Sequence, residues 1–222
     1  MKKITLVALV FCTSISAIYA QDKAFEKGNF TASLGIGVAL YKTKIHTEYN
    51  SSSIKIENDT TDGAASVVYP VCIEYGVANW LGIGARFGYS NYFEETDSIS
   101  GRKPKVTGLD LDLVFNFHLI KTKRFDMPIS LIVGYSKFKY LENDALNSMA
   151  VDNGLNYGVM LNPRIYFGDH FGMYFNAGYM GYSYNSLQFS NDIDSDINDN
   201  NKWVYGIKGN GFNIGLGLIA KF

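Results

Sequence analysis

The chain has 222 residues, and its 20 Lys and Arg residues almost balance its 21 Asp and Glu residues, leaving a formal net charge of -1 at pH 7. Without a basic excess, the sequence argues against a nucleic-acid partner. Aromatic residues make up 15% of the chain and charged residues only 18%, with 22 Gly and 4 Pro. This composition favours a β-rich chain over a disordered chain, a coiled coil or a helical bundle.

Residues 1–20 have the layout of a cleavable secretory signal peptide. Lys2 and Lys3 give a positive start, an apolar run ends at Cys12, and Ala20 is the predicted last residue before the cut. An anchor helix is the alternative, but the apolar run is about half the roughly 20 residues that a span needs. A lipid-modified Cys12 is disfavoured because bulky Phe11 precedes it. After cleavage Cys72 is the only cysteine, which excludes an internal disulfide.

Eight later segments repeat a period of two, in which every second side chain is apolar. Such alternation is typical of a half-buried β-strand, and eight such segments together are a strong signal of an all-β domain. The predicted strands are residues 30–41, 66–76, 81–92, 109–119, 128–138, 155–167, 171–182 and 212–222.

The connections between these segments alternate in length. Residues 42–65, 93–106, 139–154 and 183–202 form four long loops, and residues 77–80, 120–127 and 168–170 form short turns. An up-and-down antiparallel barrel with one end at each face of a membrane has this asymmetry. The sequence therefore predicts one eight-stranded transmembrane β-barrel domain over residues 21–222, with both termini at the short-turn end.

The two faces of each predicted strand differ in bulk. In residues 109–119, leucines and phenylalanines oppose Asp110, Asp112 and Asn116, while elsewhere the second face is mostly Gly, Ser and Asn. Too little bulk exists there for an apolar core, so the apolar face must point outward into hydrocarbon. Outward aromatics then form two girdles roughly 20 Å apart, made of Phe30, Tyr75, Phe117, Phe167, Phe171 and Phe222 below and Tyr89, Tyr135, Tyr157 and Tyr179 above. Pro163 removes one ladder donor and predicts a local bulge or weak pairing.

The last eleven residues, Phe212–Phe222, are apolar at every second position and end in Phe. They resemble the C-terminal strand of outer-membrane barrels, and the whole mature chain resembles the small eight-stranded family of the OmpA transmembrane domain and OmpX. This resemblance implies a Gram-negative outer membrane as the location. It implies that outer-membrane lipid and lipopolysaccharide are partners, that the barrel-assembly machinery reads the strand ending in Phe222, and that the chain is a monomer. It carries over no functional residues.

Inward positions carry three acids and three cations. Arg86 and Asp112 lie at similar height on adjacent strands and are predicted to pair, and Glu74 is the predicted partner of Arg164 across the lumen; Asp110 and Lys221 complete the set. Eight strands leave an interior only just wide enough for side chains, so the lumen is predicted to be plugged.

No residue is assigned a catalytic, cofactor-binding or metal-binding role. Asp192, Asp194 and Asp196 resemble the start of a calcium loop, but Ile197 and Trp203 occupy its Gly and Glu positions. The GxGxxA match at residues 215–220 is not followed by a helix and does not predict a nucleotide site. His46 with Ser51, Ser52 or Ser53 is the only arrangement that fits a lipid A-modifying acyltransferase; His118 is expected to hydrogen-bond in the lumen and His170 to lie in a tight turn.

Three functions are consistent with these observations. The first is a non-enzymatic structural or surface-interaction role carried by the long loops. The second is a narrow porin-like channel for small solutes, and the third is a lipid A-modifying outer-membrane enzyme.

Overall fold

The computed structural model describes residues 24–50, 55–94, 103–141, 149–185, 188–189 and 202–222. The predicted signal peptide, Cys12, the serines at 51–53 and the acidic run at 192–196 lie outside these residues. In the described part of the chain, no helix is both long enough and apolar enough to cross a membrane.

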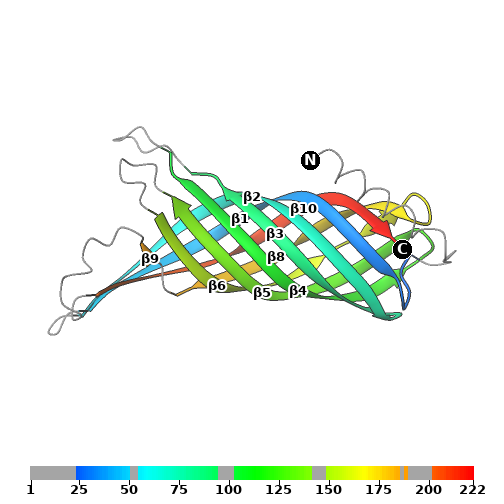
Figure 1. Cartoon of the computed structure of the whole chain (residues 1–222), viewed down its shortest axis with the longest axis horizontal. Helices are drawn as coiled ribbons and strands as arrows, with labels where there is room; N and C mark the ends of the chain where they lie inside the picture. Colours follow the sequence, from blue (N-terminus) through cyan, green and yellow to red (C-terminus); the bar gives the residue numbers. More distant parts are fainter. Residues whose placement is uncertain (1–23, 51–54, 95–102, 142–148, 186–187, 190–201) are drawn as a thin grey trace, which may run out of the picture.

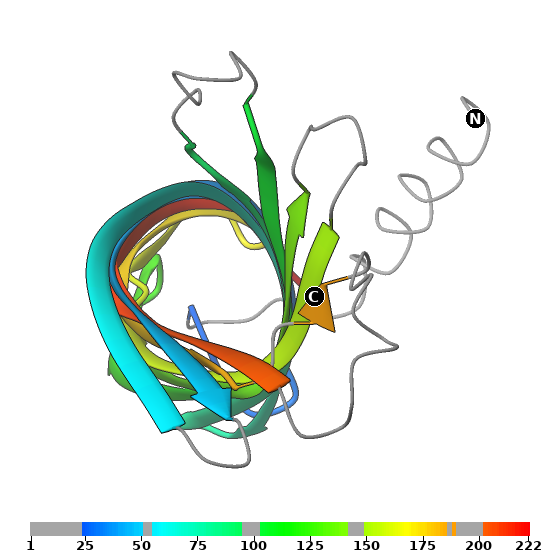
Figure 2. The same cartoon turned by 90° about the vertical axis from the view of Figure 1, so that its left-hand side faces the viewer.

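The strands form one antiparallel sheet that closes into a barrel (Figure 1). β10 pairs with β1 on one side and with β8 on the other, which completes the ring seen end-on in Figure 2. The strands are β1 (Phe30–Asn50), β2 (Lys55–Ala78), β3 (Leu81–Tyr92), β4 (Lys105–Lys121), β5 (Phe125–Leu141), β6 (Met149–Leu161), β7 (Arg164–Tyr166), β8 (Phe171–Tyr184), β9 (Gln188–Phe189) and β10 (Lys202–Lys221).

Eight walls make up the ring, as predicted, because β7 continues the wall of β6. β6 pairs with the outer part of β5, and β7 pairs with its first residues, Phe125 and Asp126. Asn162 and Pro163 separate the two strands, which confirms the predicted weak point at the proline. The short β9 adds two residues to the edge of β6.

The predicted strands are too short at the long-loop end. Residues 42–65, predicted as a loop, are mostly the arms of the β1–β2 hairpin, whose register runs unbroken from Lys42↔Gly63 to Asn50↔Lys55. β10 likewise begins at Lys202, ten residues before the predicted segment, and pairs with the same part of β1. The backbone ladder continues where the apolar alternation stops, because strand pairing depends on backbone hydrogen bonds and not on an apolar outward face. In Figure 1 these three strands reach farthest from the end that holds the C-terminus.

The outward face of the barrel is apolar, as predicted. Every second residue of β4 is exposed and every second one is buried, so Leu111 is 63% exposed while its neighbours Asp110 and Asp112 are each 2% exposed. Similar exposure of Leu40, Phe87, Tyr157 and Phe212 continues this surface around the ring. An apolar surface of this extent on a single chain is far larger than soluble monomers expose.

The inward face is more apolar than the sequence predicted. Beside glycine, serine and asparagine, a buried cluster of Val68, Val114, Ile132, Met160 and Met180 packs inside the ring. Glycine makes room for large inward side chains at close approaches: a Cβ at Gly35 would collide with the Tyr174 hydroxyl and the Leu216 carbonyl oxygen. The barrel is therefore filled across its middle, as eight strands require.

Candidate functional site

At the short-turn end, the lumen holds a buried group of four charged and polar side chains from β2, β4, β5 and β7. Arg164 Nη1 lies 2.7 Å from Glu74 Oε2 and 3.6 Å from Asp126 Oδ2. His118 lies between the two acids, with Nε2 2.8 Å from Glu74 Oε1 and Nδ1 2.8 Å from Asp126 Oδ1. This confirms the predicted Glu74–Arg164 pair and the lumen-facing role of His118.

Asp126 is the member of this group that sequence reasoning missed. Residues 120–127 were predicted as a turn, but β5 already begins at Phe125, so Asp126 is an inward strand residue with no exposed surface. Its position two residues before Pro128, on the inward phase of the same strand, was the available signal. We call Glu74, His118, Asp126 and Arg164 the lower charge layer.

The segment that precedes β1 closes the lumen beneath this layer. Phe25 and Ala24 have no exposed surface, and the Phe25 ring stacks on His118 with centroids 3.3 Å apart and planes 7° apart. Gly28, at φ 90°, turns the chain and donates its N–H to Gly76 O, and Asn29 Oδ1 accepts the Glu26 N–H at 2.6 Å. The short-turn mouth is thus covered by the chain itself.

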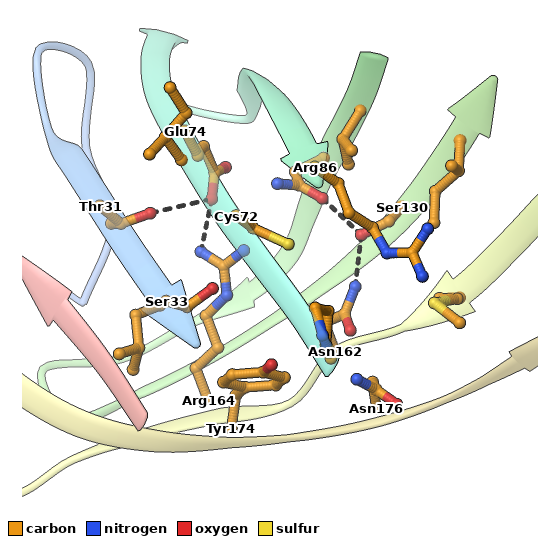
Figure 3. A pocket seen from close by; sticks show the side chains of 17 residues that line it. Thr31, Ser33, Cys72, Glu74, Arg86, Ser130, Asn162, Arg164, Tyr174 and Asn176 are labelled. Carbon is orange, nitrogen blue, oxygen red and sulfur yellow. Dashed lines mark hydrogen bonds and ion pairs between the residues drawn. The ribbon is translucent and has the colours of Figure 1, made fainter. Parts of the chain in front are cut away.

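A small polar cavity lies above the lower charge layer (Figure 3). Its volume is about 50 Å³, and Cys72, Arg86, Asn162, Tyr174 and Asn176 are among the side chains that line it. A cavity of this size holds only a few water molecules. Cys72 faces inward as predicted and lines this cavity together with Arg164 and Tyr174.

A second group of charges crosses the lumen above this cavity. Arg86 Nη1 lies 2.5 Å from Asp112 Oδ2, as predicted, and 3.7 Å from Asp110 Oδ2. Asn156 donates to Asp112 Oδ1 at 2.8 Å. All four side chains are almost completely buried. This upper charge layer, Arg86, Asp110, Asp112 and Asn156, spans from β3 and β4 to β6.

Five aromatic side chains form a closed circuit of ring contacts above the upper charge layer. Neighbouring centroids lie 5.5–6.2 Å apart, the range of favourable aromatic pairs. In order around the lumen, the members of this aromatic collar are Tyr41, Tyr92, Phe138, Tyr184 and Tyr182.

Hydrogen bonds tie the collar to the layer beneath it. The Tyr182 hydroxyl donates to Asp110 Oδ2 at 3.1 Å, and Ser136 Oγ lies 2.6 Å from both Asp110 Oδ1 and the Tyr184 hydroxyl. The collar is therefore held in place from below. Sequence reasoning assigned none of its members a role.

The collar is the floor of a cup at the long-loop end, with a volume of about 460 Å³. Its wall is largely apolar, with Ile45, Val106, Ala150 and Ile207 above the aromatic rings, and Asp62 and Glu94 also line it. The volume lies in the range of small-molecule sites, and a concave, mostly apolar wall with few polar groups is the usual form of such a site.

The remaining candidate residues do not join one site. His46 lies on the outward face of β1, where Asp59 accepts from its Nδ1 at 2.8 Å; this hydrogen bond raises the pKa of His46 above its usual 6.5. His170 lies in the turn before β8, as predicted, with Nδ1 3.0 Å from Lys221 O. Lys221 lies inside the barrel with its Nζ 5.0 Å from the Tyr166 ring centroid. Residues 215–220 are part of strand β10, so the GxGxxA match is not a nucleotide loop.

No known family and no curated protein matches the chain in sequence. Solved structures of outer-membrane proteins share its fold, among them OprG and AlkL. OprG from Pseudomonas aeruginosa is 13% identical, with a TM-score of 0.59 over 89% of this chain and 97% of OprG. The outer membrane protein AlkL, solved by solid-state NMR in DMPC lipid bilayers, is 14% identical, with a TM-score of 0.52 over 93% of this chain and 96% of AlkL. The chain therefore has the fold of the small outer-membrane β-barrel proteins, with eight walls closed by the pairing of its first and last strands.

Proposed function

We propose that the protein is an integral outer-membrane barrel of a Gram-negative bacterium, a non-enzymatic surface protein whose outer cup takes up a small apolar or aromatic solute. The exposed apolar belt, which is the outward face that continues around the ring, supports insertion into a membrane. Lipid hydrocarbon can cover such a surface on all sides of the barrel. The short-turn end then faces the periplasm, and the cup opens to the outside.

One observation carries the binding function: the cup lies above a lumen that the described side chains fill except for one small cavity. Beneath its aromatic floor come the upper charge layer, a cavity of about 50 Å³, the lower charge layer and Phe25 stacked on His118. This arrangement favours a site that holds a solute over a porin-like channel that conducts one.

Two measurements test the proposal against the channel alternative. Purified, folded protein in a planar bilayer is expected to show no large steady conductance, and a steady open channel would overturn the plugged lumen. In nanodiscs, a small apolar aromatic solute is expected to bind with one site per chain. Phe138→Ala, which removes a ring from the collar, is expected to weaken this binding, while the heat-dependent gel shift of the folded barrel persists.

The proposal includes the lipid partners and the assembly route. Lys42 and Lys44 follow Leu40 on the outward face of β1, and Lys208 precedes Phe212 on the outward face of β10. Lys44 and Lys208 face each other across these two strands, above the apolar part of the outward face. Cations at this height suit the phosphates of lipopolysaccharide. Phe222 pairs with Phe30 through two backbone hydrogen bonds that close the ring, and we propose that the assembly machinery reads this strand. The protein is proposed to act as a monomer, and deletion of Phe222 is expected to reduce its outer-membrane content.

A further inference from the structure

The inner surface around the cup carries an excess of negative charge. Asp62 and Glu94 line its wall, and Asp110 hydrogen-bonds the collar residue Tyr182 from below. Asp152 lies on the inward face of β6, where it is 6% exposed and opposite the collar residue Phe138 in the β5–β6 register.

In the described residues, few cations compensate Asp62, Glu94 and Asp110. Arg86 is shared between Asp110 and Asp112. Lys103 lies near enough to Glu94 to lower its pKa, but burial and the neighbouring Asp62 outweigh it and raise the pKa of Glu94. The outward face of the surrounding strands carries the lysines at 42, 44, 105, 137, 139 and 208. Around the cup and its floor, the carboxylates of Asp62, Glu94, Asp110 and Asp112 therefore stand against the two cations Arg86 and Lys103.

The aromatic collar adds to the attraction of cations. Tyrosine and phenylalanine rings present negative electrostatic potential on their faces, and a cation within about 6 Å of a ring centroid gains roughly 0.5–2 kcal/mol. Tyr41, Tyr92 and Phe138 come from three different strands, β1, β3 and β5, so their rings line the lumen from several sides. A ligand on the collar rests on rings from several strands, with the carboxylates of Asp62 and Glu94 in the wall above the rings and that of Asp110 beneath them.

We propose that the cup selects small organic cations, in which an ammonium group is carried on an apolar or aromatic body. The inference rests on the proposed function, since it names the charge class of the solute that the cup holds. The apolar body fills the volume bounded by Ile45, Val106 and Ile207, and the ammonium lies against the collar rings and the carboxylates. A neutral solute of the same shape gains only the apolar part of this interaction, and an anion is repelled.

A matched set of three probes tests the proposal. Benzyltrimethylammonium, its neutral carbon isostere neopentylbenzene and the anion benzylsulfonate are titrated into the full mature chain in nanodiscs, with empty nanodiscs as the reference for partition into lipid. At low salt the cation is expected to bind about tenfold more tightly than the neutral isostere, and the anion is expected to show no saturable binding. Added salt should weaken the cation's binding only.

Charge-removing variants locate the effect. In Asp62→Asn with Glu94→Gln, the preference for the cation over the neutral probe is expected to fall about tenfold, with neutral binding unchanged. The control is Glu57→Gln, which removes a carboxylate from the outward face of the same β1–β2 hairpin. This variant should keep the preference for the cation over the neutral probe. Both variants must retain the heat-dependent gel shift.

The outcomes separate this proposal from the proposed function. Equal affinity for the cation and the neutral probe, or tighter binding of the anion, would overturn the charge selectivity and leave the cup as an apolar site. Absence of saturable binding by all three probes would overturn both. A loss of preference in Glu57→Gln as large as in the double variant would overturn the proposed site. It would show that the selectivity comes from the total charge of the β1–β2 hairpin and not from the carboxylates in the cup.

Discussion

Replacement of Arg86 by methionine tests whether the lumen is closed and dry. The Arg86 side chain is 5% exposed, and its partners Asp110 and Asp112 are 2% and 0% exposed. Methionine keeps much of the apolar stem but leaves two buried carboxylates without their cation. Two unit charges about 4 Å apart interact by about 4 kcal/mol at an effective dielectric constant of about 20. Loss of one partner of a buried pair costs about 3–5 kcal/mol.

We therefore expect Arg86→Met to lower the free energy of unfolding by about 3–5 kcal/mol. The assay is urea-induced unfolding in lipid vesicles, followed by the fraction of chain that shows the heat-dependent gel shift. The double variant Arg86→Met with Asp112→Asn removes both charges of the closer pair, and Asp110 keeps its hydrogen bonds from Ser136 and Tyr182. Most of the lost stability should return in this variant.

The size of the stability loss in Arg86→Met distinguishes a closed lumen from a water-filled one. A loss below about 1 kcal/mol for Arg86→Met, the value of an exposed ion pair, would mean that water solvates the upper charge layer. That result would refute the closed lumen and favour the channel. Failure of Asp112→Asn to recover stability would show instead that the methionine disrupts packing and that the charge is not the cause.

Three further predictions concern other parts of the barrel. Phe25→Ala should cost about 3–5 kcal/mol, as for other buried phenylalanines, and should make Cys72 react faster with a water-soluble maleimide; unchanged labelling would mean that Phe25 does not cover the short-turn mouth. Gly35→Val should destabilise the barrel by about 1–3 kcal/mol, because the new Cβ meets Tyr174 and the Leu216 backbone. The control is Gly63→Val, which should be tolerated because no atom lies within 4 Å of its Cβ. Equal losses of stability in the two variants would contradict the steric argument. NMR titration should give His46 a pKa above 6.5, and this pKa should return toward 6.5 in Asp59→Asn. Because the pKa of the folded state is raised, the contribution of the His46–Asp59 contact to stability is complete below pH 6.5 and is lost as the pH rises through the raised value. An unshifted pKa of His46 would exclude the contact in solution.

The two charge layers show how far sequence reasoning reaches inside a barrel. Arg86 and Asp112 were paired correctly because they lie on adjacent strands at similar height, counted from the short turns 77–80 and 120–127 that bound those strands at the other end. Glu74 and Arg164 were paired across the lumen from their equal height. Asp126 was missed because the predicted start of β5 was three residues too late, and the strand extensions beyond the belt were missed because apolar alternation stops where hydrocarbon ends.

The sequence by itself determined the number of walls, their antiparallel order and the side that faces lipid. Those features follow from the period of two and the alternation of long and short connections, which are local properties of the chain. Only the tertiary structure decided that Phe25 covers His118 and that five rings from four strands, β1, β3, β5 and β8, meet in a collar. Alternation specifies which face a side chain occupies. Contacts inside the lumen join residues far apart in the chain, such as Tyr41 and Tyr182, which are 141 positions apart, and these contacts depend on the curvature that closure imposes.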